Sequence, residues 1–348
     1  MKARLLVHRG PSSFLLAVEE ALTKSVGEGR SPPTIRVCIF DPPAVLIGFS
    51  QDVYEEVDVE EARRLGYDIN RRPTGGGAIV MERDLTPGWE VWLPRALVGR
   101  KSIDDMYREL SRIPVEALRI LGIDARFRPK NDIEVGGRKI SGTGLFEEWG
   151  GVMFCGTVLL DLDVSKMLRV LRIPVEKLSD KAVKEVSRRI VTARELLKRL
   201  PSIDEVVNAF KRSFEDFTGL EVEEGELTGY ERRLVDELIH QKYGRREWVY
   251  EFRRASGFTR VCTYKTSGGL VRVHAKVVNE VLEQLMITGD FFTYPSTAML
   301  DLESYIKHTP VDAVRSEVLE FFRSRKATIH GIDPETLAEL IEKCLRSQ

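Results

Sequence analysis

Residues 71–82 read RRPTGGGAIVME, in which two arginines and a proline lead into three consecutive glycines and then an apolar run. Glycine loses more conformational freedom than other residues when it is fixed, so three in succession indicate a sharp turn or the close approach of another group. A β-hairpin connection satisfies this pattern. So does an anion site, because a glycine turn exposes backbone N–H groups and arginine supplies a planar charged fork.

The segments around this stretch alternate in type and predict an α+β fold. Residues 4–9 read as a strand, and Ser12 or Ser13 is expected to cap the helix that follows. Residues 35–40 and 44–49 read as paired strands, and residues 67–72 read as a strand that leads into the glycines. Further strands are predicted at 78–83, 89–94, 125–129, 131–137, 138–149 and 151–163. Helices and strands do not alternate strictly, which favours a mixed sheet over a doubly wound parallel one.

Two helical regions and a second strand-rich region complete the chain. Residues 102–122 have helical periodicity with an expected break at Pro114. Residues 164–245 are polar and helical, and strands resume after Trp248. In the strand 270–278 the apolar side chains face one way, so we expect His274 on the solvent face. These patterns predict two domains, 1–245 and 246–348, the second a smaller α+β unit.

Composition excludes several classes of protein. The chain has 53 Lys and Arg against 54 Asp and Glu, so no global basic field favours nucleic acid or an anionic membrane. No apolar run reaches the length of a membrane span, and the N-terminus does not resemble a signal peptide. The four scattered cysteines form no metal-ligand spacing, so we expect reduced thiols, neither a zinc site nor a disulfide framework, and a cytoplasmic protein.

Two later segments strengthen the anion-site interpretation. Residues 130–144, KNDIEVGGRKISGTG, contain a predicted hairpin at Gly136 and Gly137, and residues 154–163 read FCGTVLLDLD. Lys139 adds a compact positive charge, while Arg72 or Arg71 adds a planar one. The three segments in this order predict a site for a nucleoside triphosphate.

These motifs resemble the lipoate-protein ligases of the biotin and lipoate ligase superfamily, over nearly the whole chain. LAVEEAL resembles the first helix of that family, PPAVLIGFSQD its strand and turn, and ITGDFFTYP its accessory C-terminal domain. The resemblance implies ATP-dependent activation of lipoic acid to lipoyl-AMP, with Mg²⁺. It further implies transfer to a lysine of an acceptor lipoyl domain of a 2-oxoacid dehydrogenase or of an H-protein-like carrier. We expect a monomer.

The resemblance also implies roles for individual residues. Lys139 is the expected catalytic residue and contacts both the lipoate carboxylate and the AMP phosphate. Asp132 is the candidate Mg²⁺ ligand, with the capping of the NDI turn as the alternative. The remaining expected ATP-binding residues are Arg72, Gly77, Ala78, Ile79 and Val80, and the expected lipoate-binding residues are Gly75, Gly76, Lys139, Cys155 and Thr157.

Three departures from the family pattern leave alternatives open. Met81 and Glu82 replace a common His and Asp, Phe49 replaces an arginine, and Cys155 stands where many members have histidine. Related octanoyltransferases use cysteine as an acyl acceptor, so an octanoyl or lipoyl transferase is the main alternative, with Cys155 otherwise a small buried residue. No cysteine lies at 39–154 or 156–261, where the resemblance places that nucleophile. A non-catalytic lipoyl carrier is a third interpretation, and the preferred acid remains open.

Overall fold

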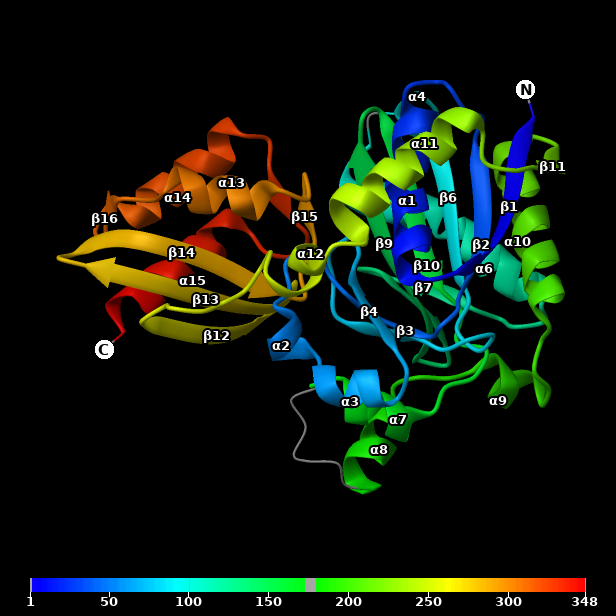
Figure 1. The fold of residues 1–348 in the computed structure, drawn as a ribbon, viewed down its shortest axis with the longest axis horizontal. Coiled ribbons are helices and arrows are strands. Elements are labelled where there is room, and N and C mark those ends of the chain that lie inside the picture. The colour runs from blue at the N-terminus through cyan, green and yellow to red at the C-terminus, as the bar shows by residue number, and fades with distance from the viewer. Residues whose placement is uncertain (1, 100, 173–179, 348) are drawn as a thin grey trace. The chain divides into compact units, whose positions relative to one another are not determined.

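The computed structural model describes residues 2–99, 101–172 and 180–347, which form two compact units (Figure 1). Unit 1 comprises residues 1–46, 57–70 and 79–245, and unit 2 comprises residues 47–56, 71–78 and 246–348. Each unit combines helices with a sheet, which confirms the predicted α+β class. Part of the helical segment predicted at 164–245, residues 173–179, lies outside the described residues.

An eight-stranded mixed sheet forms the centre of unit 1. Its strand order is β11-β1-β2-β6-β10-β9-β8-β7. β1 pairs in parallel with both of its neighbours, β2 and β11. All other neighbouring strands in this order are antiparallel. The strands are β1 (Ala3–Gly10), β2 (Thr34–Phe40), β6 (Gly88–Pro94), β7 (Arg126–Arg128), β8 (Asp132–Val135), β9 (Arg138–Glu148), β10 (Gly151–Thr157) and β11 (Val222–Glu224).

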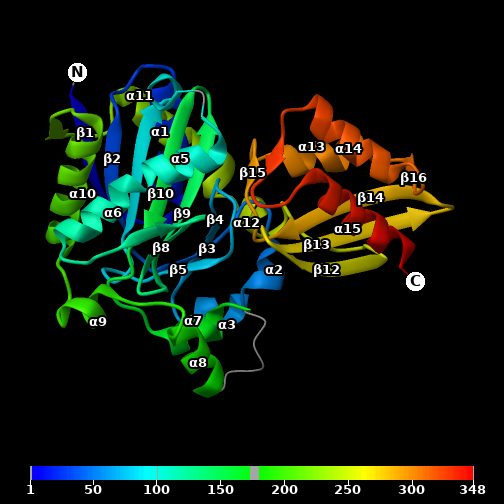
Figure 2. The same ribbon diagram turned by 180° about the vertical axis from the view of Figure 1, so that it is seen from behind.

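Helices cover both faces of this sheet because successive side chains of its strands point to opposite faces. On one face lie α1 (Ser12–Gly27) and α11 (Gly229–Leu238), and the Trp92 indole N–H donates to Glu19 O of α1 (Figure 1). On the other lie α5 (Ile103–Leu110), α6 (Arg112–Ile120) and α10 (Ile203–Thr218) (Figure 2). There Trp89 stacks on Phe210 of α10 with ring centroids 5.3 Å apart.

The other elements of the first 250 residues are short. A three-stranded sheet has the order β4-β3-β5, with β3 (Ala44–Ile47), β4 (Asp68–Arg71) and β5 (Ile79–Met81). The helices are α2 (Val53–Glu56), α3 (Val59–Arg64), α4 (Arg95–Val98), α7 (Val164–Val170), α8 (Asp180–Ser187), α9 (Ala193–Leu197), the π-helix η1 (Ile239–Tyr243) and α12 (Arg246–Tyr250). No helix among the described residues is both long and apolar enough to cross a membrane.

Unit 2 has its own sheet and its own core. The sheet is antiparallel with the order β12-β13-β14-β16, where β12 is Arg260–Thr266, β13 Gly269–Val278, β14 Val281–Gly289 and β16 Thr309–Pro310. A two-stranded sheet joins β15 (Thr293–Tyr294) to β17 (Thr328–Ile329). The helices α13 (Ala298–Tyr305), α14 (Val314–Ser324) and α15 (Pro334–Arg346) share one apolar cluster with Val271, Val273 and Ala275 of β13.

Several local predictions are wrong for identifiable reasons. The segments at 35–40 and 44–49 are not paired with each other, because β2 pairs with β1 and β6 while β3 pairs with β5. The predicted helix 102–122 breaks at Ser111 and not at Pro114, which lies within the first turn of α6, where proline is tolerated. Ser12 is already helical, and its hydroxyl donates to Asp68.

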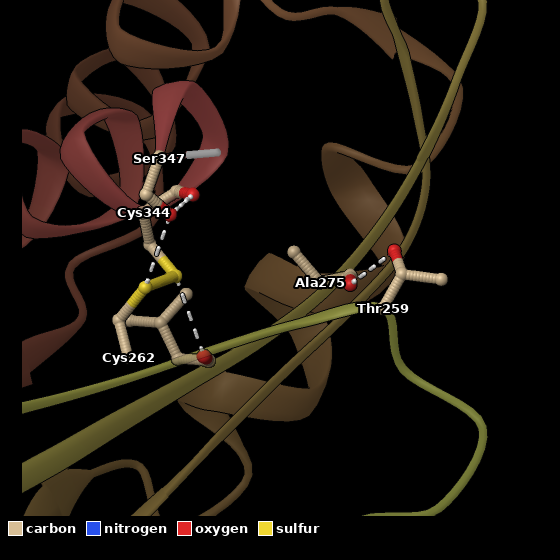
Figure 3. Close-up of a disulfide and its surroundings, with 6 residues drawn as sticks. Thr259, Cys262, Ala275, Cys344 and Ser347 are labelled. Atoms are coloured by element: carbon tan, nitrogen blue, oxygen red, sulfur yellow. Dashed lines mark hydrogen bonds between the residues drawn. A yellow bond between two sulfur atoms is a disulfide. The ribbon is translucent and has the colours of Figure 1, made fainter.

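Two predictions about unit 2 are also wrong. His274 is 2% exposed, because Glu55 and Phe258 pack over the face of β13 that sequence alternation assigns to solvent. Cys262 and Cys344 form a disulfide, although the sequence favours four reduced thiols (Figure 3). The two cysteines are 82 positions apart, and the packing of α15 beside β12 brings them together.

Candidate functional site

A short hairpin positions Lys139 in unit 1. Gly136 (φ 57°) and Gly137 (φ 78°) adopt left-handed backbone angles and reverse the chain between β8 and β9. Lys139 is the second residue of β9, and its strand has neighbours on both sides. Its backbone faces Glu134 of β8, and on the other side it accepts from Val191 N and donates to Arg189 O, each at 2.9 Å. The backbone at Lys139 is therefore fixed from two directions.

The Lys139 side chain belongs to a small network of charges. Its ammonium lies 2.6 Å from Asp132 Oδ1, and Arg128 Nη2 lies 2.7 Å from Asp132 Oδ2. Arg128 Nε also contacts Glu134 at 2.8 Å. Two cations and two carboxylates thus lie on one face of the sheet formed by β7, β8 and β9. Of the Lys139 side chain, 38% is exposed to solvent. The Lys139 side chain is therefore partly accessible from solvent.

The ion pairs keep Asp132 charged. Burial by itself raises the pKa of Asp132, but the Lys139 ammonium and the Arg128 guanidinium outweigh that effect and hold the pKa below its ordinary value. Asp132 is therefore a carboxylate at neutral pH. Both of its oxygens contact cations, Lys139 and Arg128, and the role of Asp132 toward Mg²⁺ stays a prediction.

Cys155 and Thr157 lie on the same face of the sheet as Lys139. Cys155 on β10 stands opposite Gly144 on β9, and Thr157 stands opposite Gly88 on β6. The Cys155 Sγ lies 3.5 Å from Gly144 O. The register therefore brings three predicted residues of unit 1, Lys139, Cys155 and Thr157, onto one face.

The predicted glycine turn belongs to unit 2, where it packs against the segment after β14. Gly76 N donates to Phe291 O at 3.0 Å. A Cβ atom built on Gly75 would lie 2.4 Å from that same oxygen, and Gly76 has φ 88°. Any side chain at Gly75 would therefore collide with backbone, and Gly76 needs the conformational freedom of glycine. Sequence reasoning missed this contact, because no local signal links residues 75–76 to residue 291.

The two arginines before the glycines have different surroundings. Arg72 is half-buried, and its Nη2 donates to Gly75 O at 2.8 Å and Gly77 O at 2.7 Å, so it braces the turn. Arg71 is fully buried, and its guanidinium donates to several backbone carbonyls. Its acceptors are Gly48 O, Phe49 O, Gln51 O, Trp248 O and Val249 O. Arg71 therefore holds these carbonyls together, and the role of Arg72 in binding ATP stays a prediction.

The remaining predicted residues follow the turn. The backbone N–H groups of Gly77 and Ala78 find no acceptor in the part of the chain that the structure describes. Ile79 and Val80 begin β5 and pair with Leu46 and Val45 of β3 in unit 1. The predicted site residues are thus divided, with Arg72 and residues 75–78 in unit 2 and the others in unit 1.

A metal ion does not fit the protein groups alone. Across residues 2–99, 101–172 and 180–347, no three His, Cys, Asp or Glu side chains are placed to bind one ion together. Asp132 is occupied by two cationic partners. The Lys139 ammonium and the N–H groups of Gly77 and Ala78, in contrast, are the kinds of donor that phosphate and carboxylate groups accept.

Comparison with known proteins finds one family whose members carry two different activity names. The model of the lipoyl protein ligase A/B catalytic domain matches residues 11–215. Octanoyltransferase LipM from Kyrpidia tusciae is 32% identical, and the match covers 72% of this chain and 99% of that protein. Among solved structures, a bi-partite lipoate protein ligase from Thermoplasma acidophilum is 32% identical, with a TM-score of 0.65, and the match covers 73% of this chain and 98% of that one. Lipoate-protein ligase A bound with ATP is 29% identical, with a TM-score of 0.63 over 72% of this chain and 99% of that one.

Proposed function

Because the chain belongs to the lipoyl protein ligase A/B catalytic domain family, we propose that it is an ATP-dependent lipoate-protein ligase. It activates lipoic acid to lipoyl-AMP and transfers the lipoyl group to a lysine of an acceptor lipoyl domain or an H-protein-like carrier. The observation that supports this best is the Lys139 side chain, which is partly exposed, is held on a fixed strand and carries its ammonium beside Asp132.

The chemistry of adenylation suits this arrangement. The lipoate carboxylate attacks the α-phosphorus of ATP, pyrophosphate leaves, and negative charge develops on both reactants. A lysine placed between them stabilises that charge without taking part in a covalent bond. In the second half-reaction the acceptor amine attacks the mixed anhydride, and AMP leaves. Neither half-reaction needs a nucleophilic side chain of the enzyme, and none is routed through Asp132.

Three of the four cysteines are unavailable as the nucleophile of a thiol-dependent transferase. A cysteine nucleophile requires an accessible thiolate. Cys38 is fully buried, and burial raises the pKa of its thiol. Cys262 and Cys344 are joined to each other. Cys155 is the one remaining free thiol; it is partly exposed and contacts Gly144 O, so a thiol-dependent mechanism would have to use Cys155.

The second candidate is an octanoyl or lipoyl transferase, and two observations favour it. The octanoyltransferase from Kyrpidia tusciae is as similar to this chain as the Thermoplasma ligase is. Cys155 also lies on the sheet face of Lys139. In this mechanism the acyl group moves from a carrier thioester to the Cys155 sulfur, and then to the lysine amine of the acceptor.

One experiment separates these functions. The protein is incubated with ATP, Mg²⁺ and lipoate or octanoate, and pyrophosphate release is measured, in parallel with acyl transfer from octanoyl-carrier protein without ATP. The proposal expects release of pyrophosphate with lipoate, and expects Cys155→Ser to retain most of that activity. ATP-independent transfer, with an acyl adduct on Cys155 in the intact mass spectrum, would establish the transferase instead.

A further inference from the structure

We propose that Gly142 is a positioning residue for Lys139, because its missing side chain leaves the space in which the lysine ammonium reaches Asp132. The contact itself is independent of the function assigned above. Its consequence for catalysis rests on that proposed function.

A β-bulge in β9 places Lys139 and Gly142 on the same face of the sheet. Residues three apart in a regular strand point to opposite faces of the sheet. Ser141 of β9 pairs with Ile133 of β8, whereas Lys139 pairs with Glu134, so Ile140 is an extra residue on β9. The bulge reverses the alternation and places Lys139 on the face of Gly142. Asp132 stands directly opposite Gly142 in the ladder, on that same face.

The lysine side chain then folds back over the glycine. A Cβ atom built on Gly142 would lie 2.8 Å from Lys139 Nζ and 2.9 Å from Lys139 Cε. Both distances are shorter than a normal non-bonded contact. Alanine at this position would therefore have to displace the end of the lysine side chain, which now lies 2.6 Å from Asp132 Oδ1.

Backbone geometry gives no other reason for glycine at this position. Gly142 does not adopt a positive φ, unlike Gly136 and Gly137 in the adjacent hairpin. Glycine inside a strand weakens it, and it often marks a place where another group approaches closely. Here the approaching group is the Lys139 ammonium. Because the clash involves a flexible side-chain end and not backbone, Gly142→Ala should fold normally.

The first test compares Gly142→Ala, Lys139→Ala and the double variant in the full-length protein. A misplaced charge in an active site costs on the order of 100-fold in rate. We expect Gly142→Ala to reduce adenylation by about that factor, with a melting temperature close to that of the wild type. In the Lys139→Ala background the same substitution should change neither the remaining activity nor the stability, because the clashing atoms are gone.

The second test does not depend on activity. The Asp132 carboxyl is titrated by NMR in the same variants. If Gly142→Ala moves the ammonium away, the Asp132 pKa rises, as it does in Lys139→Ala, and it rises no further in the double variant. An unchanged Asp132 titration in Gly142→Ala would overturn the inference. A shifted titration with an unchanged reaction rate would support the positioning role and count against the catalytic role of Lys139 instead.

Discussion

At the scale of single residues, the surroundings of a charged side chain decide which groups it can contact. The sequence indicates three cations near the proposed site, Arg71, Arg72 and Lys139, and the pattern alone treats the two arginines as equivalent. The structure separates them, since Arg71 is fully buried among carbonyls while Arg72 is half-buried beside the glycine turn. Burial depends on which segments meet around a residue, and adjacent positions in a sequence do not reveal it.

Lys139 gives the sharpest prediction at this scale. Lys139→Ala should lower the rate of lipoate adenylation by about 100-fold or more, because it removes a charge that acts on the transition state. Lys139→Arg should not restore the rate, since a planar guanidinium cannot replace a compact ammonium over Gly142. Adenylation rates and melting temperatures of both variants are the measurements. Near-normal rates in either variant would show that the catalytic charge lies elsewhere.

The Asp132 partner of this lysine gives a prediction about pH. The pKa of Asp132 is lower in the folded protein than in the unfolded chain. The pair therefore contributes stability above the unfolded pKa, and this contribution is lost as the pH falls through the folded pKa. Asp132→Asn should flatten the dependence of unfolding free energy on pH in the acid range. Denaturant unfolding from neutral pH to well below the ordinary carboxyl pKa would measure it, and identical profiles would contradict it.

At the scale of elements, the hairpin between β8 and β9 could be predicted but the bulge beside it could not. Gly136 and Gly137 mark a tight turn in the sequence itself. The extra residue at Ile140 depends on which residues of two strands face each other, and no local pattern encodes that. The same limit explains the wrong pairing of residues 35–40 with 44–49, since strand partners are chosen by the whole sheet.

The Arg71 side chain joins three segments of unit 2, and its removal tests whether they depend on it. Its guanidinium donates to carbonyls at 48–51 and 248–249, and its neighbours include the rings of Trp248 and Phe252. In Arg71→Leu these buried carbonyls lose their donor, which costs about 1–3 kcal/mol for each one left unsatisfied. We expect a clear loss of stability in unit 2 and faster amide hydrogen exchange at residues 72–77.

The matched control for this experiment is Arg63→Leu. Arg63 is an exposed residue of α3, and it pairs with Glu60 three positions away. An exposed pair of this kind contributes at most about 1 kcal/mol, so exchange at residues 72–77 should be unchanged in this variant. Equal exchange in both variants would show that Arg71 does not hold the glycine turn.

At the scale of the whole molecule, the sequence motifs were sufficient for the fold class and the family. The ordered segments around residues 71–80 and 130–144 indicated the lipoate-protein ligase family, and the family model confirms this over residues 11–215. The grouping of residues 47–56 and 71–78 with the C-terminal residues was not predictable from the sequence. It arises from contacts such as Gly76 N to Phe291 O, which join positions more than 200 apart.

The disulfide is the other feature of the whole chain that the sequence did not indicate, and it gives a prediction confined to unit 2. Cys262 and Cys344 are separated by 82 positions, and the loop-entropy model gives a stabilisation of about 4.5 kcal/mol for that length. Reduction should therefore lower the melting temperature of unit 2 and leave that of unit 1 unchanged.

Scanning calorimetry with and without reductant measures this difference. Thiol titration of the denatured, unreduced protein should find two free cysteines, Cys38 and Cys155. The double variant Cys262→Ser/Cys344→Ser should unfold like the reduced protein and no longer respond to reductant, whereas Cys155→Ser should respond as the wild type does. Four free thiols in the unreduced protein, or a melting temperature that reductant does not change, would contradict the role of the disulfide in holding α15 to β12.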